Sequence, residues 1–152
     1  MLHSHVRLFV HLVWSTKNRE PYLTRGVRPS VHAHILQNAR EKGVDVECMS
    51  VQVDHLHLLV SLRSDQKVDE VAKLIKGESS HWINSENIVK PKFSWQRGYG
   101  AFSISPSHVE AVRKYILGQD EHHRKRTFAE EYRTILKRYG FADGKTDESV
   151  SE

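Results

Sequence analysis

The feature that most constrains the fold is the order in which strand-like and helix-like spacings of hydrophobic residues occur along the chain. Residues 5–14 alternate apolar and polar side chains, which predicts a β-strand with one face toward the core. A four-residue apolar period then runs from Pro29 to Gly43, and a Pro at the start with a Gly after the end is typical of a helix. The next 19 residues are too many for one strand, so we expect two strands, at 44–53 and 54–62.

The second half of the chain returns to helical periods. Asp65 is a candidate N-cap for a helix over residues 68–83, whose apolar side chains follow a 3.6-residue period. Residues 93–105 are aromatic and favour β-structure. Two further amphipathic helices are expected, one that begins at Pro106 and one over residues 128–139.

These elements run β-α-β-β-α-β and end in helices, which predicts an α+β fold of the ferredoxin-like kind. Such a fold is an antiparallel sheet with helices on one face, here with C-terminal helices added. We expect a single domain over residues 1–140, followed by a disordered acidic tail at 141–152. Because this fold carries RNA-binding modules, metal carriers and nucleases alike, function has to be argued from the site.

The charge is concentrated in the body of the chain. The 152 residues hold 23 Lys and Arg against 19 Asp and Glu, a net charge of +4. The last twelve residues contain one Lys and four acids, a net of −3, so residues 1–140 carry +7. A basic body suits a polyanion such as nucleic acid, but an ordinary solvated surface of this charge is equally compatible with the sequence.

Several classes of protein are excluded by composition. The single Cys48 excludes an intramolecular disulfide framework and a zinc site built from cysteines. Neither an apolar run of membrane-spanning length nor a secretory signal is visible. The sequence therefore predicts a soluble, cytoplasmic protein.

His55 and His57 are the first candidates for chemistry. On a strand, residues two apart point to the same face, so both imidazoles could share one cation while Leu56 and Leu58 point to the core. An H-x-H pair is also met by chance, as two exposed or hydrogen-bonded histidines beside a hairpin.

Tyr115 and Gln119 are four residues apart in the third expected helix, along the edge of its apolar stripe. A tyrosine hydroxyl near a divalent cation could attack a phosphodiester, and the Gln carbonyl could bind the cation. Alternatively, the tyrosine ring simply packs on the sheet. Gly118 bears on this point, because the shared face is lost if the helix ends there.

The ordered set of segments resembles the small single-tyrosine HUH transposases of insertion sequences, including the REP-associated tyrosine transposases. Each segment alone is a weak signal, but the complete set in this order along residues 6–139 is specific to the family. The matching segments are residues 11–17 (HLVWSTK), 54–60 (DHLHLLV), 95–105 (WQRGYGAFSIS), 115–119 (YILGQ) and 121–132 (EHHRKRTFAEEY).

The resemblance implies roles for four residues. His55, His57 and Gln119 would be the metal ligands, and Tyr115 the nucleophile. Members of the family bind single-stranded DNA hairpins at element ends, form a 5′-phosphotyrosine with release of a 3′-hydroxyl, and rejoin strands by a second transesterification. The resemblance also implies Mg²⁺ or Mn²⁺, whereas two imidazoles by themselves favour Zn²⁺ or Mn²⁺. It further implies a homodimer in which the tyrosine helix can complete the partner's site, and no membrane.

Two other functions are compatible with the residues. A non-catalytic binder of single strands could stack bases on Trp95, Tyr99 and Phe102, and a metal-dependent phosphodiesterase could use water in place of tyrosine. The short acidic tail leaves an active mobile-element transposase and a domesticated nuclease both open. Candidate DNA contacts, with no signal that sets them above solvated charges, are Lys17, Arg19, Lys76 and Arg97.

Overall fold

The computed structural model describes residues 3–122 and 125–141, and its elements follow the order expected from the sequence. The strands are β1 (Leu8–Ser15), β2 (Asp45–Val51), β3 (His55–Leu62) and β4 (Gly100–Ile104). The helices are α1 (Arg28–Glu41), α2 (Val68–Ser85), α3 (Val109–Leu117), α4 (Gln119–His122) and α5 (Phe128–Arg138), with short 3-10 turns η1 (Lys17–Arg19) and η2 (Pro106–His108).

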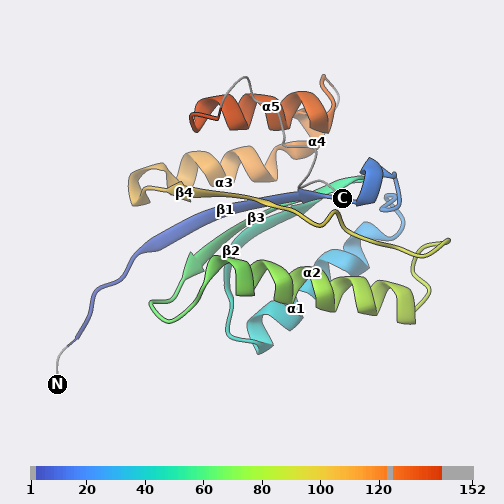
Figure 1. Ribbon diagram of the computed structural model, residues 1–152, viewed down its shortest axis with the longest axis horizontal. Coiled ribbons are helices and arrows are strands. Elements are labelled where there is room, and N and C mark those ends of the chain that lie inside the picture. The colour runs from blue at the N-terminus through green and yellow to red at the C-terminus, as the bar shows by residue number, and fades with distance from the viewer. Residues whose placement is uncertain (1–2, 123–124, 142–152) are drawn as a thin grey trace.

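The four strands form one antiparallel sheet in the order β2-β3-β1-β4. Helices α1 and α2 cover one face, and α3 and α5 lie over the other (Figure 1). This confirms the ferredoxin-like α+β fold with added C-terminal helices. Because β3 is central and both its faces are covered, seven of its eight residues are buried, and only Ser61 is partly exposed.

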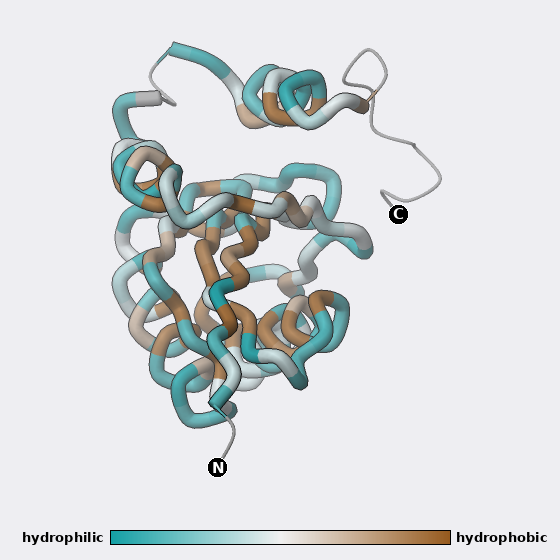
Figure 2. Tube along the Cα trace, turned by 90° about the vertical axis from the view of Figure 1, so that its left-hand side faces the viewer, coloured by the Kyte–Doolittle hydropathy of each residue, from teal (hydrophilic) through white to brown (hydrophobic). Residues whose placement is uncertain are grey.

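Hydrophobic residues, brown in Figure 2, are concentrated in the strands and on the sides of the helices that face the sheet. The larger core lies between the sheet and the α1/α2 layer and contains Leu56 and Leu58, as expected from the strand alternation. On the other face, Leu59 packs with Ile116 of α3, and Val13 packs with Phe128 of α5. The C-terminal helices therefore have their own apolar contacts with the sheet.

Three local expectations differ from the structure. Residues 5–7 lie beyond the paired part of β1, whose register with β3 begins at the Leu8–Leu62 pair. Asp65 is not the N-cap of α2; Lys67 occupies that position, and it makes no side-chain capping bond. Of residues 93–105, only Gly100–Ile104 forms a strand.

The segment before β4 is held by a side chain of α2 and by a short backbone pairing with the end of β1. The side chain of Asn84 in α2 accepts from the backbone N–H of Phe93 at 2.8 Å and donates to its carbonyl at 3.0 Å. The Phe93 ring is fully buried, and Trp95 makes a single β-bridge to Thr16. These contacts tie the segment both to α2 and to the end of β1, and the pairing with β1 is limited to one bridge, so no full strand forms there.

The tail expected at residues 141–152 lies outside the described residues except for Phe141, which is exposed. Within residues 3–122 and 125–141, no helix has the length and apolarity needed to cross a bilayer.

A close approach at the start of β4 requires glycine. A Cβ on Gly100 would lie 2.8 Å from Tyr132 Oη, 2.9 Å from Phe102 Cε2 and 3.0 Å from Val13 Cγ1. We expect Gly100→Ala to lower the free energy of unfolding by about 1–3 kcal/mol, because the extra methyl overpacks the contact between β4 and α5.

Urea denaturation measures this change, with Gly77→Ala as the matched control. Gly77 lies within α2 and has no atom within 4 Å of an added Cβ. Since alanine is the better helix former, that variant should gain about 0.5–1 kcal/mol. Wild-type stability in Gly100→Ala would contradict the packing described for β4 and α5.

Candidate metal and tyrosine site

The two histidines of the H-x-H pair stand on β3 at the centre of the molecule. His55 is 1% exposed and His57 is fully buried. Both point to the face covered by α3 and α5, so their polar atoms have to be satisfied by protein groups or by a ligand.

Glu131 of α5 completes a compact group with these two residues. Its Oε1 lies 2.8 Å from His57 Nε2 and 3.9 Å from His55 Nε2, and its side chain is fully buried. One ligand atom from each of the three residues lies within 4.8 Å of the others, so the group could hold a metal ion. The sequence reasoning gave Glu131 no role. The available signal was an acid between Phe128 and Ile135, on the buried side of an amphipathic helix.

Gln119, the ligand expected from the resemblance, lies at the same place. Gly118 does end α3, and Gln119 begins α4, so Tyr115 and Gln119 do not share one continuous helix. The two residues remain together nonetheless, since Gln119 Nε2 donates to the Tyr115 carbonyl at 3.5 Å. The Gln119 side chain is buried, and its Oε1 lies 3.4 Å from His55 Nε2.

The donor set at His55 is suited to a cation. A carboxylate can only accept, so His55 Nδ1–H donates to Asp54 Oδ1 at 2.7 Å. In the neutral imidazole this leaves a lone pair on Nε2, which is directed at the oxygens of Gln119 and Glu131. A cation shared between this nitrogen and the two oxygens would stabilise the arrangement. A carboxylate that accepts from the other ring nitrogen, as Asp54 does here, commonly orients a histidine that binds a metal.

His11 of β1 supports the second imidazole, and the sequence reasoning did not assign it. Its Nε2 lies 2.9 Å from His57 Nδ1, and the two rings stack at 5.1 Å. Burial, followed by the nearby His57, lowers the pKa of His11 to about 3, so it is neutral at physiological pH. Its ring can therefore donate to or accept from His57 Nδ1, whichever the protonation of His57 Nε2 requires.

Tyr115 packs against both of these histidines. Its ring meets His57 edge-on at 5.8 Å and His11 at 6.4 Å, so the tyrosine lies beside the imidazoles of its own chain. Burial raises the pKa of Tyr115, and the charge of Glu131 raises it further. The hydroxyl keeps its proton in this environment, and a nearby positive charge would be needed to release it near neutral pH.

The other residues singled out in the sequence lie elsewhere. Lys17, Arg19 and Arg97 are exposed. Lys76 Nζ instead donates to the carbonyls of Arg97 and Gly98 at 2.8 and 2.9 Å, and burial lowers its pKa to about 8. Lys76 therefore holds the segment before β4. In the segment 121–132, which contains several basic residues, residues 123 and 124 lie outside the described residues.

The hypothesis that bases stack on Trp95, Tyr99 and Phe102 is wrong for two of these three residues. Trp95 and Phe102 are 7% and 4% exposed, and Trp95 Nε1 donates to Ser79 Oγ at 2.9 Å. Since helices cover both faces of the sheet, neither ring can stack on a base without unpacking the core.

Comparisons with known proteins identify a family and a fold for this chain. The IS200-like transposase family model matches residues 4–119. The ISDra2 transposase TnpA of Deinococcus radiodurans is 26% identical over 120 residues, which are 76% of this chain and 86% of that protein. A crystal structure from Deinococcus radiodurans R1, assigned as a transposase, has a TM-score of 0.61 at 22% identity and covers 78% of this chain and 98% of its own.

A second solved structure resembles the fold over the whole chain. It is a REP-associated tyrosine transposase bound to a REP hairpin, with a TM-score of 0.61 and 15% identity over 100% of this chain and 96% of that one. The family model ends at residue 119, so Glu131 lies beyond the part of the chain that it matches.

The cluster predicts which side chain a bound divalent cation would depend on. We expect Glu131→Gln to weaken Mn²⁺ binding at least tenfold, because the variant keeps the side-chain shape and removes the only carboxylate among the grouped ligands. Isothermal titration of the metal-free protein measures the affinity. Glu130→Gln, an exposed neighbour on α5, is the control and should bind as wild type does. Equal affinities in the two variants would remove Glu131 from the ligand set.

Proposed function

The chain belongs to the IS200-like transposase family, and we propose that it cuts and rejoins single-stranded DNA through a covalent bond to Tyr115. The observation that carries this proposal is the position of the Tyr115 ring, edge-on to His57 and close to Gln119 and Glu131. The proposed nucleophile therefore lies next to a candidate cation group in one buried site.

The proposed reaction is a transesterification at phosphorus. The Tyr115 oxygen forms a bond to the phosphorus, the bond to the 3′ oxygen of the preceding nucleotide breaks, and a 5′-phosphotyrosine and a free 3′-hydroxyl result. The phenol proton passes to a basic group of the site, for which the Glu131 carboxylate next to that hydroxyl is the candidate. A proton returned from this group or from water converts the leaving 3′ oxygen to the 3′-hydroxyl. A second attack, by a 3′-hydroxyl on the phosphotyrosine, rejoins strands and restores the tyrosine.

We propose that His55, His57, Glu131 and Gln119 hold a divalent metal, supported by Asp54 and His11 behind the imidazoles. When bound, the cation would polarise the scissile phosphate and stabilise charge on the leaving oxygen. The carboxylate and amide oxygens add hard ligands to the two imidazoles, which favours Mn²⁺ or Mg²⁺ over a zinc site of nitrogen and sulfur ligands.

The proposed substrate is a DNA hairpin at an element end, read in the cytoplasm. In support, the fold resembles a transposase whose structure contains a REP hairpin. Lys17, Arg19 and Arg97 remain candidate phosphate contacts, since all three are exposed. A homodimer also remains part of the proposal. Because Tyr115 already lies against His57 of its own chain, a single chain holds all the proposed catalytic groups.

Trapping of the covalent intermediate tests this function. The substrates are single-stranded, hairpin-forming DNA oligonucleotides, with unstructured single strands for comparison, incubated with Mn²⁺ and analysed by denaturing electrophoresis. We expect Tyr115→Phe to abolish the protein–DNA adduct, a loss of at least about a thousandfold for a missing nucleophile. Hairpin binding should be kept, because the ring is unchanged.

Tyr132→Phe is the matched control, since Tyr132 is a half-buried tyrosine of α5 outside the cluster, and this variant should still form the adduct. Cleavage that persists in Tyr115→Phe would indicate a phosphodiesterase that uses water. Hairpin binding by the wild type without cleavage would indicate a binding module.

A further inference from the structure

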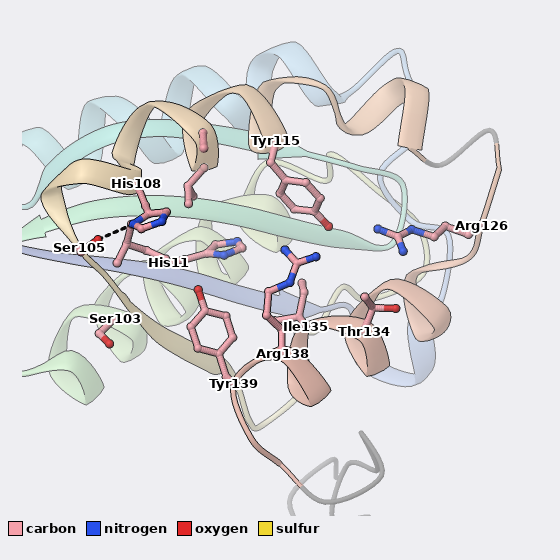
Figure 3. Close-up of a pocket in the computed structure, with 13 residues that line it drawn as sticks. His11, Ser103, Ser105, His108, Tyr115, Arg126, Thr134, Ile135, Arg138 and Tyr139 are labelled. Carbon is pink, nitrogen blue, oxygen red and sulfur yellow. Dashed lines mark hydrogen bonds between the residues drawn. The ribbon is translucent and has the colours of Figure 1, made fainter.

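A cavity of about 670 Å³ lies between α3 and α5 and reaches Tyr115 at one end. Figure 3 shows the tyrosine hydroxyl directed into it from α3, with side chains of α5 on the opposite side. The volume is within the range of about 300–1,000 Å³ that is typical of small-molecule sites. The cavity is therefore large enough for one nucleotide beside the proposed nucleophile.

Two guanidinium groups lie at the tyrosine end of this cavity. In Figure 3, Arg126 and Arg138 point toward the same space as the Tyr115 hydroxyl. Within the described part of the chain neither of them makes an ion pair with an acidic residue. The charge of Arg126 also lowers the pKa of Tyr115, against the stronger effect of burial, which agrees with its position near the ring. Planar guanidinium groups bind phosphate oxygens with two parallel hydrogen bonds.

The rest of the cavity suits a sugar and a base. Its walls include the apolar side chains of Ile104, Val112 and Ile135. At the end away from Arg126, His108 Nδ1 and Ser105 Oγ are hydrogen bonded at 2.6 Å and supply polar groups. Tyr139 also lines the cavity, and its ring is stacked on Phe102 at 4.6 Å, so it presents a fixed aromatic surface.

A second cavity of about 440 Å³ is lined by His55 and Asp54. Arg126 lines both cavities, and Lys125 adds a further cation to the second one. A phosphate held between them would have room for a chain on either side. The two spaces differ in character, because only the larger one reaches Tyr115.

We propose that the larger cavity is the subsite for the nucleotide whose 5′-phosphate becomes attached to Tyr115, with Arg126 and Arg138 holding that phosphate. This inference rests on the proposed function. Attack by the tyrosine oxygen keeps the nucleotide on the 3′ side of the cut on the protein and releases the strand that ends in the 3′-hydroxyl. The retained nucleotide occupies the cavity at Tyr115, and the released end lies toward the smaller cavity.

A mononucleotide that carries a 5′-phosphate is the direct probe. The full-length, metal-free protein is titrated with thymidine 5′-monophosphate, thymidine and inorganic phosphate, and binding is followed by NMR chemical shifts. We expect the nucleotide to bind at least tenfold more tightly than either fragment. Arg138→Gln should weaken its binding about tenfold, because a charged phosphate contact is lost.

Lys137→Gln is the control, since it removes the same charge from the adjacent exposed residue of α5, which does not line the cavity. It should leave nucleotide affinity within about twofold of wild type. Equal losses in the two variants, or binding of inorganic phosphate as tight as that of the nucleotide, would overturn the subsite, because general positive charge would then explain the binding.

A filling variant gives an independent measurement on the same cavity. Ala111 lines it from an exposed position on α3, so Ala111→Phe should occupy the space with little effect on the core. We expect it to weaken nucleotide binding and to slow adduct formation on hairpin DNA by at least tenfold. Normal adduct formation with a filled cavity contradicts the subsite and leaves the transposase function intact. Nucleotide binding without any adduct in the wild type contradicts the transposase function alone.

Discussion

The burial of two imidazoles on a strand covered from both sides is the constraint on which the rest of the site depends. His55 and His57 cannot reach water, so each neighbouring element has to supply polar groups to them. Strand β1 supplies His11, the turn before β3 supplies Asp54, and α5 supplies Glu131. The C-terminal helices therefore do more than cover an apolar face, because they complete a polar group that the sheet alone would leave unsatisfied.

The sequence predicted the strands and helices whose hydrophobic residues recur at a regular spacing. It also predicted which residues of a short motif share one face of a strand. The order of strands and helices followed from alternation and from the four-residue spacings, and His55 and His57 share a face because the strand period is two. Helix α3 ends at Gly118, which was one of the two alternatives expected from the sequence. Gln119 still reaches His55, because α4 begins directly after Gly118. Contacts set by tertiary packing could not be read in this way.

Glu131 and His11 illustrate the limit. An acid on the buried side of a helix and a histidine on a strand carry no local sign of their partners, which are 74 and 46 residues away along the chain. Residues 93–105 illustrate the opposite error. Their composition favours β-structure, but the backbone N–H and carbonyl of Phe93 are hydrogen bonded to the side-chain amide of Asn84. The rings of Trp95 and Phe102 are buried in the core and are not part of a binding surface.

The distance in sequence between these contributors has a consequence for the life of the protein in the cell. The group around His57 unites residue 11 with residue 131, which the ribosome adds to the chain much later. Because synthesis runs from the N-terminus, the strands that carry His11, His55 and His57 are made before α5. The polar group is complete only once α5 has docked, and until then a nascent chain carries its two strand histidines without the carboxylate.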